Sequence, residues 1–260
     1  MRRSILIALG LTGLAALPAS AQSLATRIGE VREGTVRFNY AARPDVCGNG
    51  ENSISTGDRH VRRNVDDDGN DCPCEYGPAR LSLAISEGTV NRIKIAVGSR
   101  WRDNGSSRIT DLGQVSPREA ASYLLDLARK SRTQAGGEAI FAVTLADSVT
   151  PWPDLLRIAR SEDVRRDTRK QSVFWLGQAA GDVATEGLTE LAEDDNEDQE
   201  VRESAVFALS QLNDDQGVPA LIRIARNNKD PKIRRTALFW LGQSDDPRAL
   251  DLFEELLAGN

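Results

Sequence analysis

The spacing of apolar residues predicts a run of amphipathic helices in the second half of the chain. Leu188, Leu191 and Ala192 lie three and four residues apart, which places them on one face of a helix. Val201 and Ala205 begin a second stripe of the same kind after a short polar interval. Two amphipathic helices in close succession predict a helical hairpin.

This hairpin pattern repeats with a period of 32 or 33 residues. Residues 174–178 (FWLGQ) return as residues 207–211 (FALSQ) and again as residues 239–243 (FWLGQ). Such a period is typical of stacked helical pairs, because one pair cannot cover its own apolar face and needs neighbours. We therefore predict an all-α solenoid over residues 151–260, with about three helical pairs and a closing helix at residues 247–257.

A second set of residues recurs at fixed positions in these units. It consists of an Asp, an apolar–Arg pair, a small residue and a Leu, present as Asp198, Val201, Arg202, Ala205 and Leu209 and as Asp230, Ile233, Arg234, Ala237 and Leu241. In the first unit Arg169 fits, but Arg165 and Thr168 replace the Asp and the apolar residue.

With this pattern the array resembles HEAT repeats, particularly the short HEAT-like repeats also found in bilin-lyase subunits. The resemblance covers residues 152–257. It implies an α-solenoid in which Asp and Arg side chains bond into a ladder along the array. It does not imply one activity, because such arrays serve many unrelated roles.

The first half of the chain has a different pattern. Alternating apolar and polar side chains predict strands, the last two joined as a hairpin, at residues 35–40, 81–86 and 91–97. Ser116 and Glu119 form a capping box that starts a helix reaching about Arg129. Residues 137–146 are largely apolar and fit either a strand or a buried helix.

The chain is predicted to have three parts. Residues 1–21 are typical of a secretory signal, with two arginines, an apolar stretch and the small-residue pattern Ala19–Ser20–Ala21. The apolar stretch, about 14 residues long, is shorter than the roughly 20 that cross a membrane. Residues 22–150 form a small α+β domain without a recognised family, and residues 151–260 form the array. We expect a secreted or periplasmic protein that is not inserted in a membrane after the signal is removed.

Charge is unevenly distributed along the mature chain. Residues 22–150 contain 17 basic and 17 acidic side chains, whereas residues 151–260 contain 14 basic and 22 acidic ones. An acidic array is a poor binder of nucleic acid, because affinity for phosphates depends on neutralisation by Lys and Arg. We therefore expect a protein partner and no nucleic acid.

Three cysteines lie in the α+β domain. In an exported protein we expect one disulfide, which joins Cys47 to either Cys72 or Cys74. A redox-active Cys72–Pro73–Cys74 segment is an alternative, and so is a zinc site that the cysteines form with His60. Both are less favoured, because the spacing matches neither the usual redox motif nor a compact zinc motif.

An acidic stretch provides a second candidate site. Asn64, Asp66, Asp68 and Glu75 occupy the first, third, fifth and twelfth positions of an EF-hand calcium loop that has glycine at its sixth. The eighth position, normally apolar, is Asp71, and a proline and two cysteines follow it. Gly77 and Pro78 rule out a long exiting helix. We favour a polar, turn-rich loop, and a calcium- or redox-responsive module is the alternative function.

Catalytic motifs are missing from the sequence. His60 is the only histidine, and no nucleophile elbow, phosphate-binding glycine loop or dinucleotide fingerprint occurs. Acidic residues are abundant, so a hydrolase that uses paired carboxylates is kept as the least favoured alternative. We predict a protein that is not an enzyme and uses no cofactor.

The surface of the array is the remaining candidate for function. Two outward helical positions recur, as Lys170, Glu203 and Arg235 and as Phe174, Phe207 and Phe239. Because such arrays bind through extended faces, we predict that these residues contact a protein partner. The alternative is that the phenylalanines pack between repeats, with Trp175 and Trp240 on the core side. The predicted function is an exported scaffold for protein–protein interaction.

Overall fold

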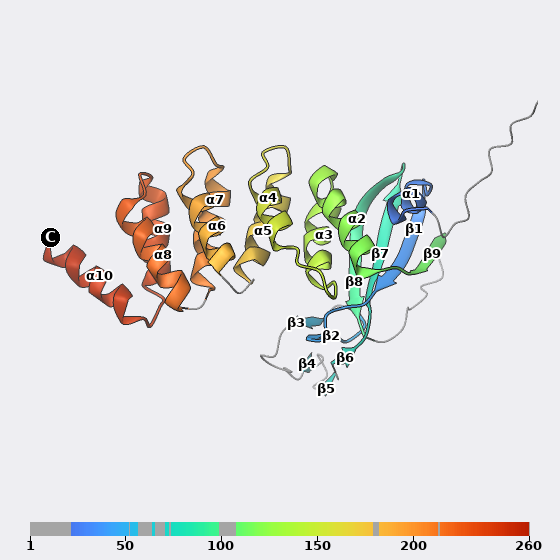
Figure 1. Cartoon of the computed structure of the whole chain (residues 1–260), viewed down its shortest axis with the longest axis horizontal. Coiled ribbons are helices and arrows are strands. Elements are labelled where there is room, and N and C mark those ends of the chain that lie inside the picture. Colours follow the sequence, from blue (N-terminus) through green and yellow to red (C-terminus); the bar gives the residue numbers. More distant parts are fainter. Residues whose placement is uncertain are drawn as a thin grey trace, which may run out of the picture.

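An α+β region precedes a row of helical pairs (Figure 1). The computed structural model describes residues 22–51, 53–56, 64–65, 71–72, 74–98, 108–178, 182–212 and 214–259 of the 260-residue chain. The predicted signal at residues 1–21 lies outside the described residues, as do Asp66 and Asp68 of the acidic stretch.

A four-stranded sheet forms the centre of the α+β region. Its strand order is β8 (Thr89–Val97), β7 (Ala79–Ser86), β1 (Gly34–Tyr40) and β9 (Ile109–Gln114). β1 pairs antiparallel with β7 and parallel with β9, and β7 pairs antiparallel with β8. Glu87 and Gly88 turn the chain between β7 and β8, both with positive φ, as a two-residue hairpin requires. The predicted strands and hairpin are confirmed.

Short strands follow β1, and a disulfide ties β2 to the residue before β6. β2 (Val46–Gly48) pairs with β3 (Ile54–Thr56) and β6 (Glu75–Tyr76), and β4 (Asn64–Val65) pairs with β5 (Asp71–Cys72). The disulfide joins Cys47 in β2 to Cys74, 27 residues later. This decides the pairing that the sequence left open. In the chain-entropy model, closing a loop of this length stabilises the fold by roughly 3–4 kcal/mol.

The rest of the described chain is mainly helical. The pairs are α2 (Pro117–Lys130) with α3 (Ala135–Thr144), α4 (Trp152–Ala159) with α5 (Arg166–Gly177), α6 (Asp182–Glu193) with α7 (Gln199–Ser210) and α8 (Asp214–Asn227) with α9 (Pro231–Leu241). α10 (Pro247–Ala258) follows alone, and the short α1 (Leu24–Gly29) packs on α2. Among the described residues after residue 150, the structure has three such pairs and then α10.

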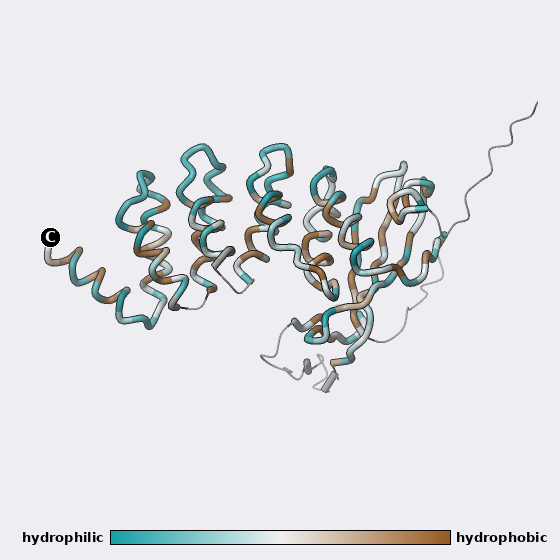
Figure 2. The backbone as a smooth tube through the Cα atoms, viewed as in Figure 1, coloured by the Kyte–Doolittle hydropathy of each residue, from teal (hydrophilic) through white to brown (hydrophobic). Residues whose placement is uncertain are grey.

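The pairs stack in order along the row. The second helices α3, α5, α7 and α9 each contact the next, and the first helices α6, α8 and α10 do the same. The loops that join α4 to α5 and α6 to α7 are polar and lie along one edge of the row (Figure 2). The apolar residues of neighbouring pairs form one buried cluster that continues into the sheet.

The pair α2–α3 connects the sheet to the array. α3 packs against both β8 and α5. The buried Tyr40 hydroxyl donates a hydrogen bond to the carbonyl of Ala142 in α3, and Glu138 of α3 accepts one from the backbone of Ile93 in β8. Residues 137–146, which fitted a strand or a helix, therefore belong mainly to a buried helix. The division of the chain at residue 150 stays a prediction, but helix stacking continues across it.

The start of α2 is capped as predicted, with one difference. The Ser116 side chain accepts a hydrogen bond from the backbone nitrogen of Glu119. The Glu119 carboxylate accepts one from the backbone nitrogen of Leu24 at 2.8 Å. The acid of the capping box thus ties the start of α1 to α2, so it serves a tertiary contact.

Buried arginines connect successive pairs of the array. Arg169 in α5 donates to the carbonyl of Ala159 in its own pair and to the carboxylate of Glu197 in the next pair. Arg202 in α7 repeats this arrangement and reaches the carboxylate of Asp230 at 3.5 Å. Side chains of both arginines are only 6% exposed. The ladder implied by the resemblance is therefore present.

The first step of this ladder differs from the expectation. Asp198 caps the N-terminus of α7, and its carboxylate pairs with Arg166 at 3.0 Å. Glu197 takes the ladder position beside it. Arg165, which replaces the Asp of the first unit, donates to the carbonyl of Arg132 at 2.6 Å and so binds the preceding pair.

A second row of ion pairs joins the first helices. They are Arg129–Asp154, Arg160–Glu190, Glu193–Arg223 and Arg226–Glu255, each between one first helix and the next. These pairs are partly exposed, so each contributes at most about 1 kcal/mol. The acidic residues of the array are thus used in part to hold its layers together, and its net charge does not make a uniform acidic surface.

We expect Arg169→Met to lower the free energy of unfolding by about 3–5 kcal/mol, because the buried carboxylate of Glu197 loses its partner. Lys170→Met is the matched control. It removes a partly exposed ion pair with Glu200 and should cost at most about 1 kcal/mol. Urea denaturation of both variants measures the difference. Equal losses would contradict a structural role for the buried ladder.

Candidate functional site

Each second helix of the stack carries a phenylalanine at the same position. Phe174, Phe207 and Phe239 were predicted from the repeat, and Phe141 in α3 adds a fourth, 33 residues before Phe174. The repeat did not predict Phe141, because residue 141 lies in the segment assigned from the sequence to the α+β domain. The offset from Phe174 was the signal that could have found it. We call these four residues the Phe row.

Tryptophans from the following helix cover two members of the Phe row. The Trp175 ring stacks on Phe141 with 4.8 Å between centroids. The Trp240 ring lies against Phe207 at 4.9 Å. Both tryptophans are half-buried, lie over the phenylalanine of the preceding helix and pack against the core cluster, as expected for residues on the core side.

The other two members of the Phe row lack this cover. Residue 208, at the position of the covering tryptophan, is alanine, and the Phe174 side chain is 40% exposed. Phe239 in the last pair is 59% exposed. The expectation that the phenylalanines pack between repeats therefore holds for part of the row, and the exposed rings alternate with covered ones.

Close approach of α5 and α7 explains the alanine. A Cβ atom added to Gly177 would lie 2.8 Å from the Cβ of Ala208 and 3.0 Å from its Cα. The two helices meet through these small residues, which leaves no room for an indole ring at position 208. The exposure of Phe174 is thus a consequence of how this junction is packed.

The predicted charged row has local partners. Lys170 forms an ion pair with Glu200 at 3.1 Å, and Glu203 accepts a hydrogen bond from Gln199 at 3.0 Å. Arg235 is exposed and donates to the carbonyl of Pro231 in its own helix. The three residues lie at exposed or half-buried positions near the Phe row, but the first two are already engaged within the array.

A cavity of about 480 Å³ lies where the Phe row meets the sheet. Phe141 and Trp175 form its aromatic wall, and Ile95 of β8 adds an apolar residue. Arg165 and Asp167, paired at 2.8 Å, contribute charged side chains to the lining. An apolar wall with polar groups at a few places suits one large side chain of a binding partner.

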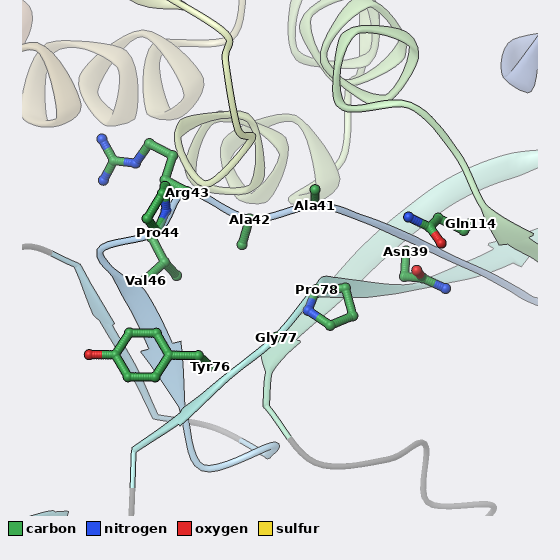
Figure 3. Close-up of a pocket in the computed structure, with 10 residues that line it drawn as sticks. All are labelled: Asn39, Ala41, Ala42, Arg43, Pro44, Val46, Tyr76, Gly77, Pro78 and Gln114. Atoms are coloured by element: carbon green, nitrogen blue, oxygen red, sulfur yellow. The ribbon is translucent and has the colours of Figure 1, made fainter.

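A second cavity, of about 410 Å³, opens where β1 and β7 separate (Figure 3). The strands are paired as far as Tyr40 and Ala79, and the chain pairs again at Cys47 and Tyr76. Between these points the segments that contain Ala42 and Gly77 lie apart and line the cavity. Its walls combine proline, tyrosine and amide side chains, and no residue of the Phe row lines it.

The predicted metal and redox sites have mixed outcomes. Cys47 and Cys74 are joined to each other, so the zinc set that required both as free thiols is wrong, and a Cys72–Cys74 disulfide is not formed. Asn64 faces Cys72 across the β4–β5 pair, and Glu75 lies in β6. The calcium hypothesis stays a prediction, because its other two ligands and His60 lie outside the described residues.

Two further features are absent from the described ranges. Within them, no group of three or more His, Cys, Asp and Glu side chains is placed to hold a metal ion. No helix in the same part of the chain has the length and apolar character needed to cross a membrane.

A family model described as HEAT repeats matches residues 185–260, from within α6 onward. The C-terminal part of this chain is a HEAT-repeat domain. No curated protein matches the chain. The pair α4–α5, where the Asp of the repeat pattern is replaced by Arg165, lies before the matched residues. HEAT repeats generally mediate protein–protein interactions and are typically non-enzymatic scaffolds.

We expect the covered and exposed phenylalanines of the helical array to differ in their effect on stability. Phe207→Ala should cost about 2–3 kcal/mol, because it removes a half-buried ring and the contact of that ring with Trp240. Phe174→Ala should cost less than about 1 kcal/mol, since much of that ring is already in water. Thermal or urea unfolding measures both. Similar large losses would show that Phe174 is a packing residue and not a free surface.

Proposed function

We propose that the protein is an exported, non-catalytic scaffold that binds a protein partner through the Phe row of its helical array. The observation that supports this most directly is the exposure of Phe174 and Phe239, at 40% and 59%. Large aromatic side chains in partial contact with solvent are common anchors of protein interfaces, because they bury much area at little entropic cost.

The surroundings of the Phe row fit an interface. Each exposed ring meets a tryptophan edge-on, Phe174 with Trp175 and Phe239 with Trp240. This contact fixes the ring orientation before binding, which reduces the entropy that binding costs. The exposed amides of Gln178, Gln211 and Gln243 recur beside the rings and supply hydrogen-bonding groups for a polar rim.

Export is supported by two features. Residues 1–21 have the pattern of a cleavable signal, and α1 begins soon after it with Ser23 as its N-cap. The Cys47–Cys74 disulfide is of the kind that persists in oxidising compartments such as the periplasm or the extracellular space. The proposed location is therefore secreted or periplasmic.

The binding proposal is tested by affinity capture of the mature protein from its own exported fraction. We expect one reproducible partner whose recovery falls at least about ten-fold when Phe174 and Phe239 are both changed to Ser, since aromatic anchors dominate interface energy. Glu186→Ser, an exposed change on the first helix α6, is the control and should not alter recovery. Equal recovery of the partner with the wild-type protein, the double variant and the control would rule out the Phe row as the binding surface.

Export is tested by identifying the first residue of the native protein isolated from its own cells. We expect intact-mass analysis of the native protein to show a chain that starts at Gln22, because cleavage follows the small-residue pattern ending at Ala21. The measured mass should also be two hydrogens below that of the fully reduced chain, because one disulfide has formed. A chain that retains residues 1–21 and three free thiols would contradict export.

A further inference from the structure

β8 forms the edge of the sheet that lies toward the helical array (Figure 1). One side of β8 pairs with β7, so alternate residues of β8 direct their N–H and C=O groups away from the sheet. Ile93 and Val97 belong to this outward set. The Ile93 nitrogen donates to Glu138, and the Val97 carbonyl accepts from the backbone nitrogen of Gly50 at 2.8 Å. Ile95 lies two residues from each and therefore belongs to the same set.

The outward backbone groups of Ile95 are not paired with any backbone group in the described ranges of the chain. The preceding part of the edge is covered, because the Val90 carbonyl accepts from the Thr133 hydroxyl at 2.7 Å and Glu138 bonds to Ile93. An N–H and a C=O on the edge of a sheet can pair with an extended segment of another chain. The break in cover at Ile95 is therefore a place where the backbone of a partner can pair.

The cavity of about 480 Å³ beside the Phe row adjoins this part of the edge. Ile95 lines the cavity. Thr133 and Glu138 line it too, and their side chains are the ones that bond to outward groups of β8. The elements around the cavity thus approach β8 from its outward side. The edge at Ile95 and the cavity form one continuous site.

The side chain of a residue paired with Ile95 would point into this cavity. Paired residues on neighbouring strands direct their side chains to the same face of a sheet. The Ile95 side chain packs against the core cluster, whereas its neighbour Lys94 is exposed. A residue opposite Ile95 therefore directs its side chain toward α3 and α5, where Phe141 and Trp175 stack at 4.8 Å and form the aromatic wall.

Charged side chains around the cavity already bond to one another. Arg165 pairs with Asp167 at 2.8 Å. Glu138 pairs with Arg92, also at 2.8 Å, and accepts from the backbone of β8. A charged side chain that entered the cavity would lose its water without gaining an unengaged partner of opposite charge. The apolar wall and the paired charges together favour a large apolar side chain.

We propose that this site binds an extended segment of the partner protein through one large apolar residue. The backbone N–H and C=O of that residue exchange hydrogen bonds with Ile95, and its side chain fills the cavity against Phe141 and Trp175. We call Ile95, Phe141 and Trp175 the pairing site. The proposal rests on the proposed function for the existence of a protein partner, and it adds the conformation and chemistry of the segment that is recognised.

A panel of synthetic peptides tests the chemistry of the segment. Each is a fluorescently labelled heptapeptide of alternating serine and threonine, with leucine, tryptophan, serine or lysine at the central position. Fluorescence anisotropy with the mature protein should show that the leucine and tryptophan peptides bind at least about ten-fold more tightly than the other two, because only they fill the apolar cavity. Equal binding of all four, or no binding of any up to about millimolar concentration, would overturn the proposal.

Methylation of the peptide backbone tests the pairing with Ile95. A methyl group on the central nitrogen removes the hydrogen-bond donor and should weaken the tryptophan peptide by about ten-fold or more. The same group on the nitrogen of the last residue is the matched control and should have little effect. Equal affinity of the two methylated peptides would show that the cavity takes a side chain without strand pairing, and would contradict the proposal.

A variant of the cavity wall tests the location. Gly137 in α3 lines the cavity, and a Cβ atom added to it would lie 3.3 Å from the Cγ of the flexible Gln171 side chain. We expect Gly137→Leu to weaken the tryptophan peptide at least about ten-fold, because the leucine occupies the cavity. Its thermal stability should not fall, since leucine favours a helix more than glycine does. Glu186→Leu on α6 is the control and should bind normally. Normal binding by Gly137→Leu would place the peptide elsewhere.

Capture of the partner from the exported fraction separates this proposal from the wider role of the Phe row. Loss of capture with Gly137→Leu, together with normal capture by the Phe174 and Phe239 double variant, would support the pairing site and contradict binding through the exposed rings. The reverse result would support the exposed rings and overturn the pairing site. Loss of capture with both would support both proposals, and normal capture by both would contradict both.

Discussion

A pair of amphipathic helices cannot cover its own apolar face, and the architecture of this protein follows from that constraint. Each pair exposes apolar residues toward both neighbours, so a row of pairs is stable only if both of its ends are closed. At the N-terminal end the sheet closes the row, because α3 packs against β8 as well as α5. The sheet is therefore a structural part of the array and not only a neighbour in sequence.

Packing between layers also decides which side chains remain available to a partner. Where a tryptophan follows, as at Trp175 and Trp240, the phenylalanine of the preceding helix is covered. Where Ala208 allows α5 and α7 to approach closely, Phe174 is left exposed. The same alternation of large and small residues that fits the layers together thus sets the spacing of the exposed aromatic rings. Packing between layers also engages charged side chains, because many acids of the array pair with arginines of the adjoining layer.

Periodicity was enough to predict the helices of the array, because it reports a face that must be buried whatever covers it. Turn chemistry was equally informative at Ser116, whose short side chain caps α2. The sequence pattern alone could not identify which distant residues contact each other in the fold. Residues 137–146 are buried on several sides, so their apolar run had no period to distinguish helix from strand. The choice of Cys74 over Cys72 depends on β6 lying beside β2, a long-range pairing that local sequence does not encode.

The sheet and the helical pairs form one continuous stack through α3. Hydrogen–deuterium exchange of the intact protein tests it most directly, because amides that open only with global unfolding share one exchange free energy. We expect the slowest amides of β1, β7, α3 and α5 to exchange with the same free energy of opening. A clear step in protection between α3 and α5, with the sheet and the array exchanging as separate units, would show that the stack is not continuous.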